Sequence, residues 1–179
     1  DKLVNKIKEL VLKLKVGNPI EDIEIVPLIN EKAAIQVEES VNNAVNGGAK
    51  ILTGGKRDGA FYQATVLDNV THNMDLVINE TFGPIAPIIR VNGVDDAIKM
   101  ANATEYGLPA GVFTEHYYSA MKCANEIEAG TVFVNKQSTF RTDNMPFGGF
   151  KNSGVGKEGI KYAVDEMTKT KLIILFLMI

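Results

Sequence analysis

The feature that most constrains the fold is a regular alternation of apolar, β-type runs with helical patterns across residues 85–135. The pattern predicts three strands, at residues 85–91, 110–114 and 131–135, and two intervening helices, at residues 95–103 and 117–128. A strand–helix–strand order places successive strands in parallel, with the helices packed on the sheet. The sequence therefore predicts an α/β fold with a mostly parallel βαβ sheet and helices on both faces.

Further elements are predicted on either side of this alternation. Before it, apolar spacing and turn residues predict helices at residues 2–15 and 30–46, the second capped by Asn30, and strands at residues 50–52 and 61–66. After it, the pattern predicts a polar, glycine-rich stretch at residues 136–156, a short helix at residues 157–164 and a final strand at residues 170–174. The polar stretch is too long for a passive connector in a compact domain, which indicates a functional loop.

Composition excludes several classes of protein. The chain has 179 residues, 45% of them hydrophobic, and a net charge of −3 without a basic stripe, so we expect no nucleic-acid partner. Its longest apolar run is the last eight residues, too short to span a membrane. No apolar leader opens the chain, and the single cysteine indicates a reducing compartment, so we expect a cytoplasmic protein. The chain begins inside a predicted helix without methionine, and we therefore expect it to be a piece of a longer protein.

Two features that could suggest chemistry are better explained by structure. Cys123 shares a helical face with Ala120, Ala124 and Ile127, so we interpret it as a small buried hydrophobe and not as a nucleophile. The G-x-G-x-x-G spacing at residues 154–159 lacks the preceding strand of a dinucleotide fingerprint and is interpreted as a turn leading into a helix. With one cysteine and two histidines, we expect no metal site.

Two other segments carry side chains suited to binding. Glu80 and Phe82 stand just before a predicted strand, where a carboxylate could accept hydrogen bonds from a ribose diol and a ring could pack on a flat heterocycle. The alternative is a capped turn with a core phenylalanine. Arg141 lies in the long polar stretch and could bind a carboxylate or phosphate through its guanidinium fork. The alternative is an arginine that is paired with Asp143 or simply solvated.

Together, four segments resemble the aldehyde dehydrogenase superfamily and occur in that family's order. They are Glu80-Thr81-Phe82-Gly83-Pro84, Ala101-Asn102-Ala103-Thr104-Glu105-Tyr106-Gly107-Leu108, Gly130-Thr131-Val132-Phe133-Val134-Asn135 and Pro146-Phe147-Gly148-Gly149-Phe150-Lys151-Asn152-Ser153-Gly154. The resemblance covers almost the whole chain and is closest to lactaldehyde and non-phosphorylating glyceraldehyde-3-phosphate dehydrogenases. It implies that residues 1–167 are the later portion of the catalytic domain, and that residues 168–179 are an oligomerisation strand and tail.

The resemblance also implies a reaction and a set of roles. In this family a cysteine thiolate attacks the aldehyde, hydride passes to NAD or NADP, and a glutamate-activated water releases the carboxylic acid from the thioester. Glu80 and Phe82 correspond to cofactor-binding residues, and Glu158 to an acid that relays protons near the catalytic centre. The residues that correspond to substrate-binding positions are Asn135, Gln137, Phe140 and Arg141, with Arg141 as the ligand of an anionic group on a small aldehyde.

The departures from the family pattern are as informative as the matches. The nucleophilic cysteine, the general base and the adenosine-binding domain would all precede Asp1, so we expect this chain alone to be inactive. The apolar strand at residues 170–174 implies a homo-oligomer, a dimer or a tetramer. Two alternatives stay open: a non-catalytic oligomerisation or binding module with the same fold, and a reductase of the superfamily that forms an acyl ester or releases phosphate.

Overall fold

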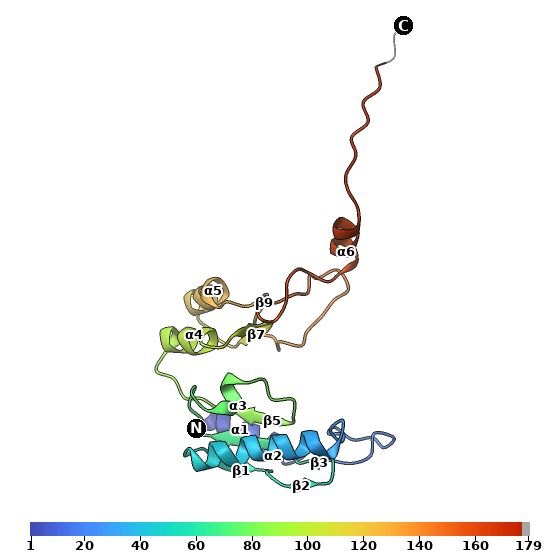
Figure 1. Cartoon of the computed structure of the whole chain (residues 1–179). Coiled ribbons are helices and arrows are strands. Elements are labelled where there is room, and N and C mark those ends of the chain that lie inside the picture. The colour runs from blue at the N-terminus through green and yellow to red at the C-terminus, as the bar shows by residue number, and fades with distance from the viewer. Residues whose placement is uncertain (177–179) are drawn as a thin grey trace. The chain divides into compact units, whose positions relative to one another are not determined.

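The computed structural model describes residues 1–176, which form two compact units, the N-terminal unit (residues 1–93) and the C-terminal unit (residue 94 onward) (Figure 1). The helices are α1 (Lys2–Val11), α2 (Glu31–Asn46), α3 (Asp75–Ile78), α4 (Val94–Asn102), α5 (Tyr117–Glu126) and α6 (Ile160–Met167). The strands are β1 (Lys50–Thr53), β2 (Arg57–Asp58), β3 (Phe61–Tyr62), β4 (Thr65–Asp68), β5 (Ile85–Pro87), β6 (Tyr106–Gly107), β7 (Pro109–Val112), β8 (Thr131–Val134) and β9 (Phe150–Lys151).

A three-stranded sheet of order β1-β4-β5 forms the centre of the N-terminal unit. β1 runs antiparallel to β4, and β5 runs parallel to it. All four residues of β4 are buried, and since successive side chains of a strand point to opposite faces, both faces of β4 must be covered. α1 and α2 provide this cover from the two sides, so helices on both faces of the sheet are confirmed for this unit (Figure 1).

The helix α2 forms where the sequence predicted it, for two local reasons. Its N-cap is Asn30, whose side-chain oxygen accepts a 2.8 Å hydrogen bond from the backbone N–H of Ala33. Its apolar stripe then buries Val37, Val41 and Ala44 in one core with Leu67 of β4. Each of these buried valines contributes on the order of 1.5 kcal/mol by the transfer of its side chain from water. This packing makes α2 a firm wall for the segment that follows α3.

An ion-paired cluster closes the end of β4. Arg90 donates hydrogen bonds of 3.1 Å and 2.7 Å to the two carboxylate oxygens of Asp68, and a third of 2.8 Å to Asp1. The hydrogen bonds from Arg90 lower the pKa of the Asp68 carboxyl below its ordinary value, while burial acts in the opposite direction. The buried end of β4 therefore depends on the ionised form of Asp68.

This dependence gives a prediction for stability against pH. A carboxyl whose pKa is depressed in the folded state stabilises the protein above its unfolded pKa of about 3.9, and that stability is lost as the pH falls through the folded pKa. We expect the free energy of unfolding to fall more steeply below about pH 5 in the parent chain than in Asp68→Asn. Urea titrations of both proteins between pH 6 and pH 2.5, values chosen to span about this window, measure the two slopes. Equal slopes would show that Asp68 does not contribute.

The C-terminal unit contains the strand–helix–strand motif that the alternation predicts. β7 and β8 pair in parallel with Ala110 opposite Val132, and α5 connects them and packs on β8. Cys123 lies on the inner face of α5 with 6% of its surface exposed, as expected for a structural residue. β5 pairs with β4 in the N-terminal unit, and β7 pairs with β8 in the C-terminal unit.

One prediction for the last forty residues needs correction. The helix α6 begins at Ile160 instead of residue 157, because the three residues before it are held by a backbone bridge between Phe147 and Glu158. Residues 168–176 are exposed and have no regular secondary structure, and the strand predicted at residues 170–174, which would pair with a second copy, stays a prediction. A strand requires a neighbour for its N–H and C=O groups, and residues 1–176 provide none here. The predicted tail beyond residue 176 lies outside the described residues.

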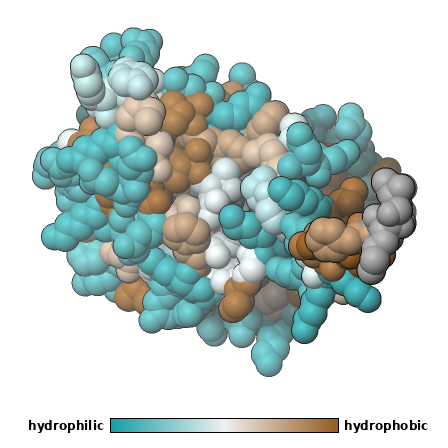
Figure 2. Space-filling view, turned by 90° about the horizontal axis from the view of Figure 1, so that it is seen from above, coloured by the Kyte–Doolittle hydropathy of each residue, from teal (hydrophilic) through white to brown (hydrophobic). Residues whose placement is uncertain are grey.

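Large apolar side chains reach the surface in both units, as the brown areas of the viewed face illustrate (Figure 2). In residues 172–176 the exposed fractions run from 64% to 90%. Among the described helices, none combines the length and the apolar character that crossing a membrane requires. Exposed apolar surface on this scale is typical of surfaces that are covered by other polypeptide.

Candidate functional site

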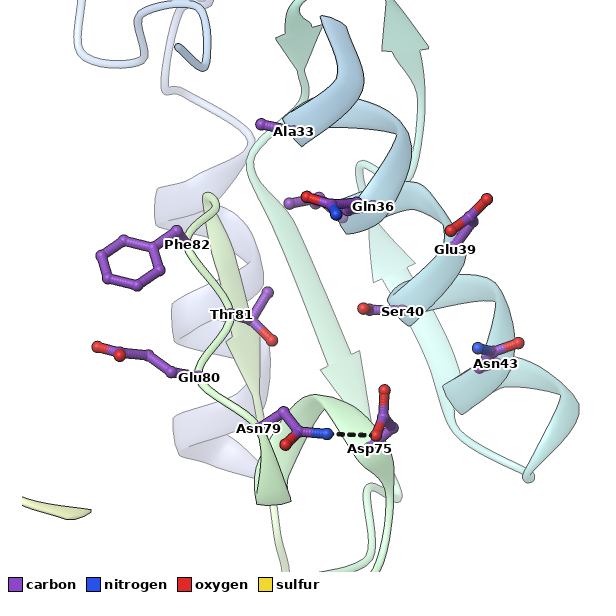
Figure 3. Close-up of a pocket in the computed structure, with 11 residues that line it drawn as sticks. Ala33, Gln36, Glu39, Ser40, Asn43, Asp75, Asn79, Glu80, Thr81 and Phe82 are labelled. Carbon is purple, nitrogen blue, oxygen red and sulfur yellow. Dashed lines mark hydrogen bonds between the residues drawn. The ribbon is translucent and has the colours of Figure 1, made fainter. Parts of the chain in front are cut away.

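In the N-terminal unit, Glu80 and Phe82 lie on an extended segment between α3 and β5. Successive side chains of this segment alternate, so Glu80 and Phe82 project to the same side, whereas Thr81 faces α2 (Figure 3). Both residues border a cavity of about 410 Å³ between this segment and α2. Phe82 is 77% exposed, which rules out the alternative of a core phenylalanine. A carboxylate and an aromatic ring are thus displayed side by side at the edge of the unit.

The short helix α3 holds this segment in place. Asn79 ends the helix, and its amide donates a 2.5 Å hydrogen bond to the Asp75 carboxylate (Figure 3). The hydroxyl of Thr81 donates to the backbone carbonyl of Leu76, and Leu76 is buried in the core. The backbone on each side of Glu80 is therefore fixed, while its carboxylate stays free to accept hydrogen bonds. The arrangement suits a sugar diol at the carboxylate and a flat ring at Phe82.

In the C-terminal unit, aromatic rings and one arginine border a small cavity of about 70 Å³. Phe140 and Arg141 line it, together with Phe133 of β8 and Phe147. The rings of Phe133 and Phe140 meet edge to face, with centroids 6.2 Å apart. The guanidinium carbon of Arg141 lies 4.1 Å from the centroid of the Phe147 ring. Within residues 1–176 Arg141 has no carboxylate partner, so the predicted alternative of a pair with Asp143 is not formed.

Asn135 and Gln137 are placed differently from Arg141. The side chain of Asn135 accepts a 2.9 Å hydrogen bond from the backbone N–H of Thr114 and donates one of 3.0 Å to its carbonyl. Its φ of 54° marks a sharp turn at the end of β8, and asparagine tolerates this left-handed conformation better than most residues. Gln137 is exposed, and its backbone carbonyl accepts from Phe140. Neither side chain lines the aromatic cavity.

Glu158 lies beside the glycine-rich loop. Its backbone N–H and C=O both pair with Phe147, at 2.6 Å and 3.1 Å, and its side chain is exposed. It borders a cavity of about 300 Å³ lined largely by the loop's glycines. Because Phe147 also lines the aromatic cavity, its backbone links Glu158 to the residues around Arg141. The Glu80 pair belongs to one unit and the Arg141 and Glu158 groups to the other, and each is described by itself.

A junction between two motifs is a feature that sequence analysis missed. β6 pairs antiparallel with β9, which joins the segment around Asn102 to the loop around Lys151. The ammonium of Lys151 donates to the carbonyls of Asn102 and Thr104, at 2.8 Å and 3.1 Å, and pairs with Glu128. The Ser153 hydroxyl accepts from Gly107. The side chains of Lys151 and Ser153 thus form hydrogen bonds with backbone groups. The one signal for this junction in the sequence was the position of these residues near Tyr-Gly and Gly-Gly pairs.

Phe133 and Phe147 were also missed as site residues. Sequence analysis assigned Phe133 to a strand and Phe147 to a loop motif, and gave neither a binding role. The signal available in the sequence was the presence of aromatic residues on both sides of Arg141 along the chain. As for metals, the described residues contain no group of three or more His, Cys, Asp or Glu side chains placed to hold an ion.

The N-terminal unit thus presents an exposed Glu–Phe pair after a short helix, and the C-terminal unit presents a glycine-rich loop beside Glu158. Residues 1–173 match the Aldehyde dehydrogenase family, and the chain belongs to this family. A 3-sulfolactaldehyde dehydrogenase from Priestia aryabhattai is 51% identical over 173 residues, which are 96% of this chain and 36% of that protein. A lactaldehyde dehydrogenase from Methanococcus aeolicus is 47% identical over 97% of this chain and 37% of its own length.

Solved structures agree in fold. A glyceraldehyde-3-phosphate dehydrogenase from Methanocaldococcus jannaschii, complexed with NADP, matches with a TM-score of 0.88 and 45% identity over 93% of this chain and 36% of that chain. An aldehyde dehydrogenase from Physcomitrella patens, in complex with the reaction product succinate, matches with a TM-score of 0.90 and 39% identity over 98% of this chain and 37% of that chain. The chain thus spans a little over a third of the length of the relatives it matches. The predicted family and fold class are confirmed.

Proposed function

We propose that this chain is the later portion of the catalytic domain of an NAD(P)-dependent aldehyde dehydrogenase that oxidises a small, anionic aldehyde to the carboxylic acid. The observation that carries the proposal is the paired display of Glu80 and Phe82 on one side of a rigid segment, with the ring 77% exposed. An exposed carboxylate and an exposed ring side by side are available to bind a ligand. A nicotinamide nucleoside offers a diol for the first and a flat heterocycle for the second.

The cofactor would be held on this chain by Glu80 and Phe82. When bound, NAD or NADP supplies the hydride acceptor of the oxidation. The Glu80 carboxylate would accept hydrogen bonds from the ribose hydroxyls, and the Phe82 ring would lie against the nicotinamide. Names of relatives support this assignment, since one is an NADP-dependent glyceraldehyde-3-phosphate dehydrogenase and two solved structures contain NADP. Contacts that distinguish NAD from NADP would come from polypeptide outside this chain.

The substrate would meet the C-terminal unit at the loop that follows β8. Arg141 would bind the anionic group, with Phe140 and Phe133 as the apolar wall beside it. The names of relatives include 3-sulfolactaldehyde and glyceraldehyde-3-phosphate dehydrogenases, whose substrates carry a sulfonate or a phosphate. Asn135 and Gln137 would shape the turn between β8 and the loop, and Glu158 would relay protons from its place beside Phe147.

The catalytic nucleophile and general base would lie outside this chain. Its one cysteine, Cys123, is buried in α5. We therefore expect no aldehyde-dependent NAD(P)H formation by the chain alone, and measurable turnover would contradict this part of the proposal. The exposed residues 168–176 would add as a strand to a second copy, giving a dimer or tetramer. Light scattering that finds a monomer at high protein concentration would contradict it.

Glu80→Gln tests the cofactor assignment in the whole enzyme. The amide keeps the size of the side chain but loses the charge, and a hydrogen bond to a charged group contributes about 1.5–3 kcal/mol, so we expect the KM for NAD(P) to rise about tenfold or more. The matched control is Asp58→Asn, which neutralises an exposed carboxylate in the β2–β3 hairpin of the same unit and should leave this KM unchanged. An unchanged KM in Glu80→Gln would remove Glu80 from the cofactor site.

A further inference from the structure

In the contact between Arg141 and Phe147, both the cation and the ring line the aromatic cavity. We propose that Phe147 is a positioning residue, which holds the Arg141 guanidinium flat against its ring so that the N–H edge faces the anionic group of the aldehyde. This inference rests on the proposed function, and it assigns the selection of anionic aldehydes to a pair of residues instead of Arg141 alone.

One guanidinium can contact the Phe147 ring and bind an anion at the same time. The guanidinium carbon lies over the Phe147 ring, 4.1 Å from its centroid, which is within the range of a cation–π contact. A guanidinium donates its hydrogen bonds in its own plane, toward its edges. Stacking and a bidentate hydrogen bond to a sulfonate, phosphate or carboxylate therefore use different parts of the same group. No carboxylate of residues 1–176 neutralises Arg141, so its charge is available.

The two partners differ in how firmly their backbones are held. Phe147 is tied to Glu158 by two backbone hydrogen bonds, of 2.6 Å and 3.1 Å. Its neighbour Gly148 packs its carbonyl directly against Gly130. Arg141 lies in a turn held only by local bonds, such as the one from Phe140 to the carbonyl of Gln137. A long side chain on such a turn loses rotamer freedom when it binds a ligand, and a ring that already restrains it reduces this loss.

Lys136 provides an internal comparison. Its ammonium lies 4.9 Å from the centroid of the Phe140 ring, so it is also a cation on an aromatic ring in the same loop. Lysine is a point charge without a planar fork, however, and Lys136 does not line the aromatic cavity. Of these two cations, Arg141 is therefore the one placed to bind an anion in the aromatic cavity.

The test compares two aldehydes that differ by one sulfonate, 3-sulfolactaldehyde and lactaldehyde, in the whole enzyme. The readout is the ratio of kcat/KM for the two, because a partly unfolded variant lowers both values equally. We expect Phe147→Leu to lower this ratio about tenfold through KM of the anionic aldehyde, in line with the strength of a partly desolvated cation–π contact. We expect Phe147→Tyr, which keeps a ring, to restore it. Lys136→Met is the matched control and should leave the ratio within about twofold.

The outcomes separate this inference from the function on which it rests. If Arg141→Leu leaves the ratio unchanged, the anion-binding role in the proposed function fails. If Arg141→Leu lowers the ratio but Phe147→Leu lowers both efficiencies equally, Phe147 only shapes the pocket and the positioning role is overturned. If Lys136→Met lowers the ratio as much as Phe147→Leu, the loop acts through its total charge. In the double variant, Phe147→Leu should cause no further fall in the ratio once Arg141 is leucine.

Discussion

Arg141→Leu is expected to lower kcat/KM for an anionic aldehyde about 100-fold, while kcat/KM for the neutral aldehyde of the same carbon skeleton stays within about threefold. The reason is that a guanidinium binds an oxyanion through two charge-assisted hydrogen bonds, and leucine removes both together with the charge. The Arg141 side chain has no carboxylate partner within residues 1–176, so its removal leaves no acid unpaired there. Steady-state kinetics on the two substrates measure the effect.

A second variant makes the Arg141 result specific. Arg141→Lys keeps the positive charge but loses the planar fork, and we expect it to recover less than about a tenth of the lost efficiency. If Arg141→Leu lowers kcat/KM equally for both aldehydes, Arg141 maintains the loop and does not bind the anionic group. Full recovery in the lysine variant would mean that charge alone is sufficient.

Local signals in the sequence predicted the parts of the fold that depend on local interactions. Asn30 caps α2 as predicted, because the N-cap hydrogen bond joins residues three apart in the chain. The helical spacing of apolar residues around Cys123 predicted its buried position on α5. The motif containing Glu80 and Phe82 identified the pair that the structure displays on one side of an extended segment. Their roles in cofactor binding stay predictions.

The errors in prediction concern interactions between distant parts of the chain. Periodicity gives the order of strands, but it does not say which edges pair, and so the antiparallel pairing of β6 with β9 was not foreseen. The strand predicted at residues 170–174 has a β-branched sequence but no neighbour within the described chain, and its pairing with a second copy stays a prediction. The start of α6 was misplaced because Glu158 pairs with Phe147, eleven positions earlier.

The loop that carries Phe147 and Glu158 depends on a close backbone contact that no local pattern indicates. A methyl group built on Gly130 would lie 1.8 Å from the carbonyl oxygen of Gly148 and 2.7 Å from its carbon. Gly130 also donates a 2.9 Å backbone hydrogen bond to Gly107, so it cannot easily move away. Gly148 is confined as well, since a methyl group built on it would lie 2.4 Å from the carbonyl oxygen of Gly156. The residue before β8 must therefore be glycine.

Gly130→Ala is accordingly expected to destabilise the protein by about 3 kcal/mol or more, the upper range for overpacking against atoms that cannot move aside. The midpoint of thermal unfolding should fall by more than about 5 °C, and activity of the whole enzyme should fall with it, because the displaced loop carries Phe147 and Glu158. The control is Gly17→Ala, whose new methyl would meet Ile23 at an ordinary 3.5 Å, and we expect a change below about 1 kcal/mol there. If Gly130→Ala melts at the parent temperature with full activity, the loop must be able to relax, and it could not hold the Phe147 ring rigidly beneath the Arg141 guanidinium.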